Sequence, residues 1–465
     1  MNQYIEQFRL VTYLIAGYLI GCSLGLLVIQ DNFMLLLLAF SLPLGLILFF
    51  SPRFSLYVIL FSVFFIDWLM HLDLIPPEAT LVPELALLIL TIRVVVLKIQ
   101  DKKFAKTPIN IPILIFILWG FLSALINSQH IVTTIIGFRF DLKYILMFFL
   151  LVNLDLDEQF FKRIIYIVII LLLIQVPVAV VKLQLYGQGE WAIGTYAGHG
   201  GIYSTMLPLI AISIFLGLFL YEKHRWGYVF FSLLFILFSI VGGKRAFVFF
   251  GLLLFLFLFW QAGKKNLVRL LAIAPLFLVA LGACVYFIPT LKPAFKDPKH
   301  IVDYTVAYST AHSRETGKAI GRTSAMMTAY SIAKENPVNL LFGFGPGSLA
   351  PSYFKEFEGK LLNIIPIRYG FSQWVTMSLE YGWVGVLLFL WLFIPLFRVN
   401  QKFFHVTNDN YWKAISFGFK GILFTYLMGF FYSVIFRLDL LGFIFWLFAA
   451  TIYCMGKKSF EVKVL

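Results

Sequence analysis

Residues 321–347 read GRTSAMMTAYSIAKENPVNLLFGFGPG and lie at the centre of a polar stretch from Leu291 to Gln373. This stretch is the only long part of the sequence without an apolar run that would span a membrane. It holds ten Lys and Arg residues against six Asp and Glu residues. A basic surface beside a bilayer attracts lipid head groups, phosphates or acidic sugars. We therefore expect this stretch to contribute to a binding site for an anionic molecule.

The rest of the chain has the composition of a membrane protein. Of 465 residues, 61% are hydrophobic and only 13% are charged, whereas soluble domains have about 25% charged residues. Apolar runs of about 18 residues or more recur, and each is long enough to cross the hydrocarbon core. The sequence predicts an all-α integral membrane protein with about 12–14 transmembrane helices. The polar stretch is predicted to be one large extracytoplasmic loop that contains short helices.

Charges in the short loops predict the orientation. Lys and Arg residues cluster in every second short loop and in the C-terminal tail, which places both termini in the cytoplasm. The long loop is then extracytoplasmic, because long loops cross the membrane largely regardless of charge. Three regions follow: 1–290, an N-terminal bundle of about eleven helices; 291–373, the large basic loop; and 374–465, the C-terminal helices and cytoplasmic tail.

Composition also excludes several classes of function. The net charge of +14 reflects largely the cytoplasmic Lys/Arg bias of membrane proteins, and no nucleic-acid motif accompanies it. The three cysteines fall in apolar runs with no metal-ligand spacing. We expect no nucleic-acid partner, no cofactor and no metal. A retained first helix near residues 10–29 is expected, since it lacks a clear cleavage site.

Within the large loop, local signals predict one helix and one turn. Thr323 or Ser324 would cap a helix that runs through Met326 and Ile332 and ends before Asn336. The glycines of 343–347 predict a turn, because they follow a helix and lack the Lys-Ser/Thr of a phosphate-binding loop.

Cations at unusual places are the first candidates for a site. Lys244 and Arg245 follow a Gly-Gly turn in a short outer loop, where the charge pattern predicts few Lys or Arg residues. Two cations at this place would bind a diphosphate. Arg139 and Lys143 lie inside an apolar run, one helical turn apart on a shared face, while Asp141 points elsewhere. An ion pair that locks helices together is the alternative interpretation for these two.

The large loop and its flanks supply further candidates. Arg322 directly precedes a helix start, which is a favourable place for an anion, and Arg314 is a weaker candidate nearby. Glu380 would act as a base or hold an arginine. His199 and His312 are the outward histidines, with His199 the candidate for substrate binding.

Several motifs occur in one order along the chain: Gly137-Phe138-Arg139, Gly194-Thr195-Tyr196, Gly243-Lys244-Arg245, Gly321-Arg322, Leu340-Leu341-Phe342-Gly343-Phe344-Gly345 and Glu380-Tyr381-Gly382-Trp383-Val384-Gly385. With this order and sidedness, residues 110–455 resemble the O-antigen ligase and O-antigen polymerase superfamily. The superfamily often has His-Asn shortly before the last motif, where this chain has Phe371-Ser372. The resemblance associates that histidine with ligases, so the departure favours a polymerase.

The resemblance implies a membrane glycosyltransferase of the bacterial inner membrane. It would move a glycan from undecaprenyl diphosphate to a lipid-linked acceptor on the outer face, among membrane lipids and with a chain-length regulator as a possible partner. Arg245, Arg322 and Glu380 would be catalytic, and Arg139, Lys143, Lys244, Arg314 and His199 would bind substrate. Arginines that stabilise the leaving group would make a metal unnecessary. A ligase that uses a terminal acceptor and a lipid or solute transporter remain the alternatives.

Overall fold

The computed structural model describes residues 15, 17, 18, 21, 25 and 43–462, except 102–103, 197–199, 223–225, 290, 296, 298, 313–316, 320 and 368–369. Within these residues the protein is all-helical, as predicted, with two isolated β-bridges and no β-strand. The helices before the polar stretch are α3 Pro52–His71, α4 Val82–Asp101, α5 Asn110–Ile126, α6 Ile131–Asn153, α7 Glu158–Tyr186, α8 Gly200–Tyr221, α9 Trp226–Val241, α10 Ala246–Gln261 and α11 Lys264–Phe287.

Among the described residues, the polar stretch contains three short α-helices, and four helices follow it. The short ones are α12 Lys299–Ser309, α13 Arg322–Lys334 and α14 Pro337–Phe342, and the later ones are α15 Gln373–Trp391, α16 Phe393–Val406, α17 Asn410–Tyr432 and α18 Asp439–Val462. Short 3₁₀ turns are η1 Pro77–Leu81, η2 Glu190–Ala192, η3 Lys292–Phe295 and η4 Lys355–Phe357. The helix predicted in the loop is confirmed as α13, but Gly321 is its N-cap, not Thr323 or Ser324.

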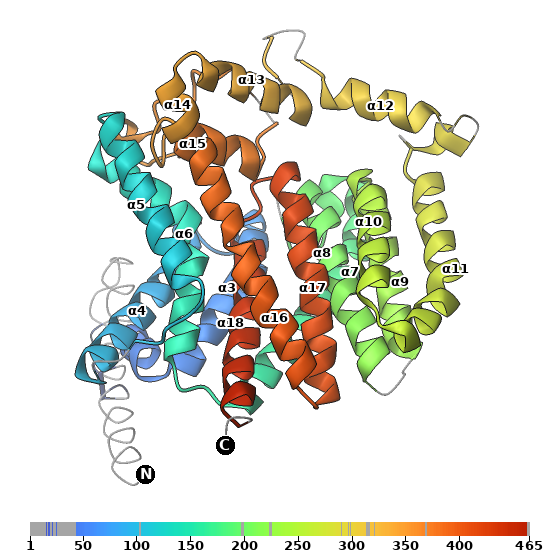
Figure 1. Cartoon of the computed structure of the whole chain (residues 1–465), viewed down its shortest axis with the longest axis horizontal. Coiled ribbons are helices and arrows are strands. Elements are labelled where there is room, and N and C mark those ends of the chain that lie inside the picture. The colour runs from blue at the N-terminus through green and yellow to red at the C-terminus, as the bar shows by residue number, and fades with distance from the viewer. Residues whose placement is uncertain are drawn as a thin grey trace.

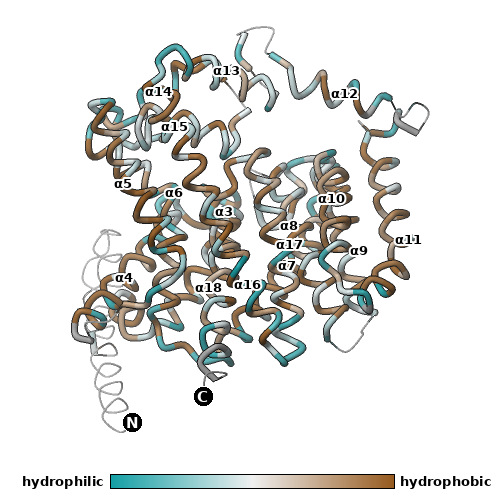
Figure 2. The backbone as a smooth tube through the Cα atoms, in the orientation of Figure 1, coloured by the Kyte–Doolittle hydropathy of each residue, from teal (hydrophilic) through white to brown (hydrophobic). Residues whose placement is uncertain are grey.

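The chain is a multi-pass membrane protein. Among the described residues, eight helical spans are long and apolar enough to cross a bilayer, and three shorter apolar helices, α5, α9 and α10, accompany them. The first helix predicted near residues 10–29 lies largely outside the described residues. The predicted total of 12–14 spans and the three-region division stay predictions. Apolar residues cover the helices, and hydrophilic residues gather near their ends (Figure 2).

The loop helices occupy one side of the molecule. In Figure 1, α12, α13 and α14 lie beyond the ends of α8, α10 and α17, on the side opposite the C-terminal end of α18. The bridges of Ala319 to His312 and Ile367 connect the link between α12 and α13 to the segment that precedes α15. These bridges therefore connect the two halves of the polar stretch to each other.

Helices α8 and α17 form the centre of the bundle. Almost all of α8 is buried, and it packs against α17 and α9. Small residues allow close contact, because a Cβ on Gly217 would overlap the Ala414 carbonyl, and one on Gly418 would lie 3.0 Å from the Ile214 Cα. Close backbone approach at small residues is a main source of helix association in membranes.

This packing gives a testable prediction. Gly217→Ala should lower the thermal stability of the purified protein by several degrees, because the added methyl group has no room and overpacking costs about 1–3 kcal/mol. Gly282→Ala is the matched control, since Gly282 is also helical but has no atom within 4 Å of the added Cβ. It should be neutral or stabilising by up to about 1 kcal/mol. Equal melting temperatures for both variants, measured by thermal unfolding in detergent, would contradict this packing.

Candidate active site

The glycine turn at 343–347 docks into a break in α15. Gly382 has φ +68°, so the helix is interrupted there. The break releases two backbone carbonyls of the preceding turn. Leu379 O accepts a hydrogen bond from Phe344 N at 2.7 Å, and Glu380 O accepts one from Gly345 N at 3.0 Å. The predicted turn is thus confirmed, and it fills the break with protein backbone groups.

The same turn also contacts α5, α6 and the link between them. Asn127 Nδ2 donates to Gly343 O at 2.9 Å, and Gln129 Nε2 donates to Pro346 O at 2.6 Å. Gly137 on α6 must be glycine at this contact, because a Cβ there would overlap the backbone of Gly347. The turn therefore holds α5, α6 and α15 in one arrangement.

Next to this turn is a buried charge cluster. Arg437, in the corner between α17 and α18, donates from Nε and Nη2 to the two oxygens of Asp141 at 2.8 Å each. Its Nη2 also donates to Glu380 Oε2. Tyr381 OH donates to Asp141 Oδ2 at 2.9 Å, and Glu380 Oε1 accepts from Leu349 N at 3.0 Å. The side chains of Asp141 and Glu380 are fully buried, and that of Arg437 is 11% exposed.

This cluster determines what Glu380 does in the fold. Both of its carboxylate oxygens already accept hydrogen bonds, one from Arg437 and one from the backbone that follows the glycine turn. Of the two roles predicted for Glu380, the structure shows the one in which it holds an arginine. A catalytic role for Glu380 stays a prediction.

Arg139 and Lys143 lie on the other face of α6, as predicted. Arg139 Nε donates to Glu84 Oε2 at 2.7 Å, and Lys143 Nζ contacts Glu84 Oε1 at 3.0 Å and Asp439 Oδ1 at 2.5 Å. These groups border a cavity of about 250 Å³ whose walls come from α3, η1, α4, α6, α8 and the corner before α18. Its charged lining residues are Asp67, Glu84, Arg139, Lys143, Arg437 and Asp439.

The cavity does not carry a surplus of positive charge. Three cations and three carboxylates line it. Two further carboxylates, Asp141 and Glu380, pair with Arg437 but are not among the lining residues. An anion gains little from cations that carboxylates already neutralise. The cavity instead offers carboxylate oxygens that accept hydrogen bonds from hydroxyl groups.

The connector before α8 positions one wall of this cavity. Thr195 Oγ1 donates to Phe64 O at 2.6 Å, and Thr195 N donates to Gln175 Oε1 at 2.8 Å. The adjacent Tyr196 stacks on Tyr203 at 4.2 Å between ring centroids, and Tyr203 lines the cavity. His199 lies outside the described residues, so its predicted role stays a prediction.

Arg322 is held differently, by an aromatic ring and a carbonyl. It is the first residue of α13, and its Nε donates to Tyr432 O at 2.5 Å. Its Cζ lies 3.9 Å from the centroid of the Tyr432 ring. Among the described residues, no carboxylate pairs with Arg322. These contacts hold the guanidinium in place without neutralising its charge. The guanidinium is therefore suited to bind an anion.

Arg245 also lies against a tyrosine, on a neighbouring element. It forms the N-cap of α10, and its Cζ lies 4.4 Å from the ring centroid of Tyr308 on α12. Gly321, directly before Arg322, packs against the backbone of Tyr308, since a Cβ there would overlap it. Phe250 of α10 contacts Tyr432 at 5.3 Å between centroids. The structure therefore brings together the elements that carry Arg245 and Arg322.

The other predicted cations separate into two cases. Lys244 pairs with Glu190 of η2 and contacts Gly201 at the start of α8. Arg314 lies outside the described residues.

Sequence reasoning missed Arg437 and Asp439, which line the cavity on α6. A signal was present in the sequence, because Arg437 lies in a short outer loop, where Lys and Arg residues are otherwise scarce. Lys244 and Arg245 were identified by the same signal.

Residues 230–390 match the O-antigen ligase family. The match covers 161 of the 465 residues, about a third of the chain. The match runs from α9 to α15 and includes Arg245, Arg322 and Glu380, whereas Asp141 and Arg437 come from outside it. No curated protein matches the chain.

This match supports the superfamily that the sequence motifs predict. The family consists of glycosyltransferase-like membrane enzymes that act on lipid-linked glycans. The match supports, in general terms, an activity of the O-antigen ligase or polymerase type. Arg245 and Arg322 lie against Tyr308 and Tyr432, and a separate cavity at α6 is lined by carboxylates.

The buried charge cluster gives the second prediction. Arg437→Met should destabilise the protein by about 3–5 kcal/mol, because two buried carboxylates lose their cation. Arg53→Met is the matched control: Arg53 pairs with Asp157 at 3.3 Å, and both side chains are 52% exposed. An exposed pair contributes about 0–1 kcal/mol. Thermal unfolding of both variants in the same detergent measures the difference, and a comparable loss in both would refute the role of the cluster.

Proposed function

We propose that this protein is a polysaccharide polymerase that uses polyprenyl-diphosphate-linked glycans on the outer face of the bacterial inner membrane. The observation that carries the proposal is the setting of Arg322, a guanidinium fixed on Tyr432 with no carboxylate partner among the described residues. With Arg245 on the neighbouring element, it would bind the diphosphate of the donor. The outer location rests on the alternation of charge in the short loops.

The second substrate would use the cavity on α6. A polymerase joins two lipid-linked glycans, so it needs a place for the acceptor hydroxyl as well as for the donor diphosphate. The carboxylates of Asp67, Glu84 and Asp439 line the cavity and would accept hydrogen bonds from sugar hydroxyls. Arg139 and Lys143 would orient those carboxylates. The corner 433–438 lies between the Arg322 contact at Tyr432 and this cavity.

The reaction would be a displacement at the anomeric carbon of the donor. The acceptor hydroxyl oxygen forms the new C–O bond, and the bond from the anomeric carbon to the phosphate oxygen breaks. The diphosphate leaves with the electron pair, and its growing charge would be stabilised by Arg322 and Arg245. The hydroxyl proton passes to a carboxylate of the cavity. Because Glu380 is not among the residues that line the cavity, we assign Glu380 a positioning role.

A polymerase is favoured over a ligase by the segment before α15. At the place of the ligase-associated His-Asn, this chain has Phe371-Ser372. Ser372 is fully buried and caps α15, with its hydroxyl accepting from Val375 N at 3.3 Å. Phe371, at the place of the histidine, offers no imidazole, and Ser372, at the place of the asparagine, has a structural role.

The function is tested by deleting the gene in its source organism and sizing the surface polysaccharide. Arg322→Ala should convert long chains into single repeat units, and Arg322→Lys should remain strongly impaired, because a point charge does not replace a planar bidentate fork. Loss of one such donor costs about 100- to 1,000-fold in rate. Arg398→Ala on α16 is the matched control and should restore full-length chains. Long chains left on the carrier would instead indicate a ligase, and unchanged polysaccharide would indicate a transporter.

Metal independence gives a separate prediction. The purified enzyme should keep its activity in excess chelator, because arginines would carry the charge of the leaving group. The measurement compares polymer length and rate with and without chelator. Complete loss of activity that a divalent ion restores would contradict this prediction.

A further inference from the structure

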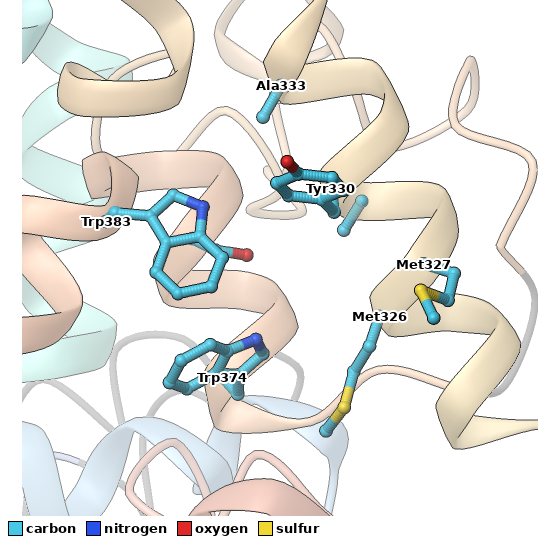
Figure 3. Close-up of a pocket in the computed structure, with 8 residues that line it drawn as sticks. Met326, Met327, Tyr330, Ala333, Trp374 and Trp383 are labelled. Atoms are coloured by element: carbon cyan, nitrogen blue, oxygen red, sulfur yellow. The ribbon is translucent and has the colours of Figure 1, made fainter.

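A second hollow lies between the loop helix α13 and the span α15. It has a volume of about 200 Å³ and is lined by Met326, Met327, Ala329, Tyr330, Ala333, Trp374, Ser378 and Trp383. In Figure 3, Trp374 and Trp383 on α15 face the methionines, Tyr330 and Ala333 of α13. We call this hollow the α13–α15 groove. Neither the polymerase mechanism nor the family match assigns it a role.

The α13 wall of the groove is suited to an apolar ligand. Met326, Met327, Ala329 and Ala333 present thioethers and methyl groups, which form no strong hydrogen bonds. Across the groove, the hydroxyl of Ser378 already donates to Val375 O at 2.9 Å. A sugar ring would leave hydroxyl groups unpaired against these four side chains, which is costly. Methionines, by contrast, adapt to irregular apolar chains.

One end of the groove lies at the proposed diphosphate site. Arg322 and Met326 are one helical turn apart on α13, so they share a face. Trp374 packs on Phe431 at 5.2 Å between centroids, and the next residue, Tyr432, is the ring beneath Arg322. A ligand whose charged group binds Arg322 would therefore extend its neighbouring apolar part into the groove.

The other end continues onto surface that faces the bilayer. Trp383, Leu387 and Trp391 recur at every fourth residue of α15 and share one face of the helix. Leu387 is 64% exposed, and on α17 Leu427 and Phe431 are 40% and 42% exposed. In a membrane-spanning bundle, such exposed apolar side chains contact lipid. Exposed apolar side chains of α15 and α17 therefore adjoin the residues that line the groove.

We infer that the α13–α15 groove binds the isoprenoid segment next to the diphosphate of the lipid carrier, and that the carrier reaches Arg322 from the bilayer along α15 and α17. This inference rests on the proposed function. The groove is smaller than the 300–1,000 Å³ typical of pockets for whole small ligands. It therefore holds only the first isoprene units, and the rest of the chain stays in lipid.

The first test detects the occupant directly. A photoreactive amino acid at Met327, whose side chain is 66% exposed, should crosslink to radiolabelled polyprenyl diphosphate in vesicles. Excess unlabelled polyprenyl diphosphate should abolish that crosslink. At Val279 on α11, which is 73% exposed, any crosslink to bulk lipid should be insensitive to the competitor. Absence of a competable crosslink at Met327 would overturn the inference.

The second test uses kinetics. Met327→Glu places a charge at the rim and should raise the KM for the full-length lipid-linked donor about tenfold, with kcat unchanged. With a glycosyl diphosphate that has no isoprenoid, the variant and wild type should give equal KM values. Ile364→Glu, at a loop position that is 75% exposed, is the matched control and should behave as wild type with both donors.

The outcomes separate this inference from the proposed function. A raised KM with the tail-less donor as well would show that the groove binds sugar, and an unchanged KM with both donors would show that it binds neither; each overturns the inference. If wild type makes polymer but the crosslink fails, only the inference is wrong. If wild type makes no polymer, the proposed function fails, while the crosslink still reports on the groove because it needs no turnover.

Discussion

The arrangement of this protein depends on the neutralisation of Arg437 by Asp141 and Glu380. A charge buried within a membrane bundle is costly unless it is paired and hydrogen-bonded. Arg437 satisfies this requirement with three hydrogen bonds to two carboxylates. Because the partners lie on α6, on α15 and in the corner before α18, the pairing fixes these three elements together. A shift of any one of them would leave a buried charge without a partner.

The glycine turn and the broken helix follow from the same constraint. Glu380 reaches Arg437 immediately before the break at Gly382, and the carbonyls released by the break are bonded by the turn at 343–347. The large loop is thereby attached at its C-terminal half, while α13 is attached through Arg322 and Tyr432. The structure therefore places these two arginines in different settings. Arg437 is neutralised and structural, whereas Arg322 keeps its charge on the side of the loop helices.

Local signals in the sequence were sufficient for the helices and for the shared face of Arg139 and Lys143. Hydropathy identifies apolar spans, and a spacing of four residues places two side chains together whatever surrounds them. The partners of those charges could not be predicted. Asp141 and Arg437 are 296 positions apart, and no local pattern says which of several carboxylates will meet a given cation. For the same reason the sequence could not distinguish the neutralised Arg139 from Arg322, although this difference decides which of them suits a diphosphate.

The most direct test of the account is the affinity of the purified protein in lipid nanodiscs for polyprenyl diphosphate. Wild type, Arg322→Ala and Arg139→Ala are compared at one ionic strength. Arg322→Ala should weaken binding at least about tenfold, a change of about 1.4 kcal/mol. Arg139→Ala should stay within about twofold of wild type, because Glu84 already neutralises Arg139. Loss of affinity in Arg139→Ala with unchanged binding in Arg322→Ala would place the diphosphate in the cavity on α6 and contradict the account.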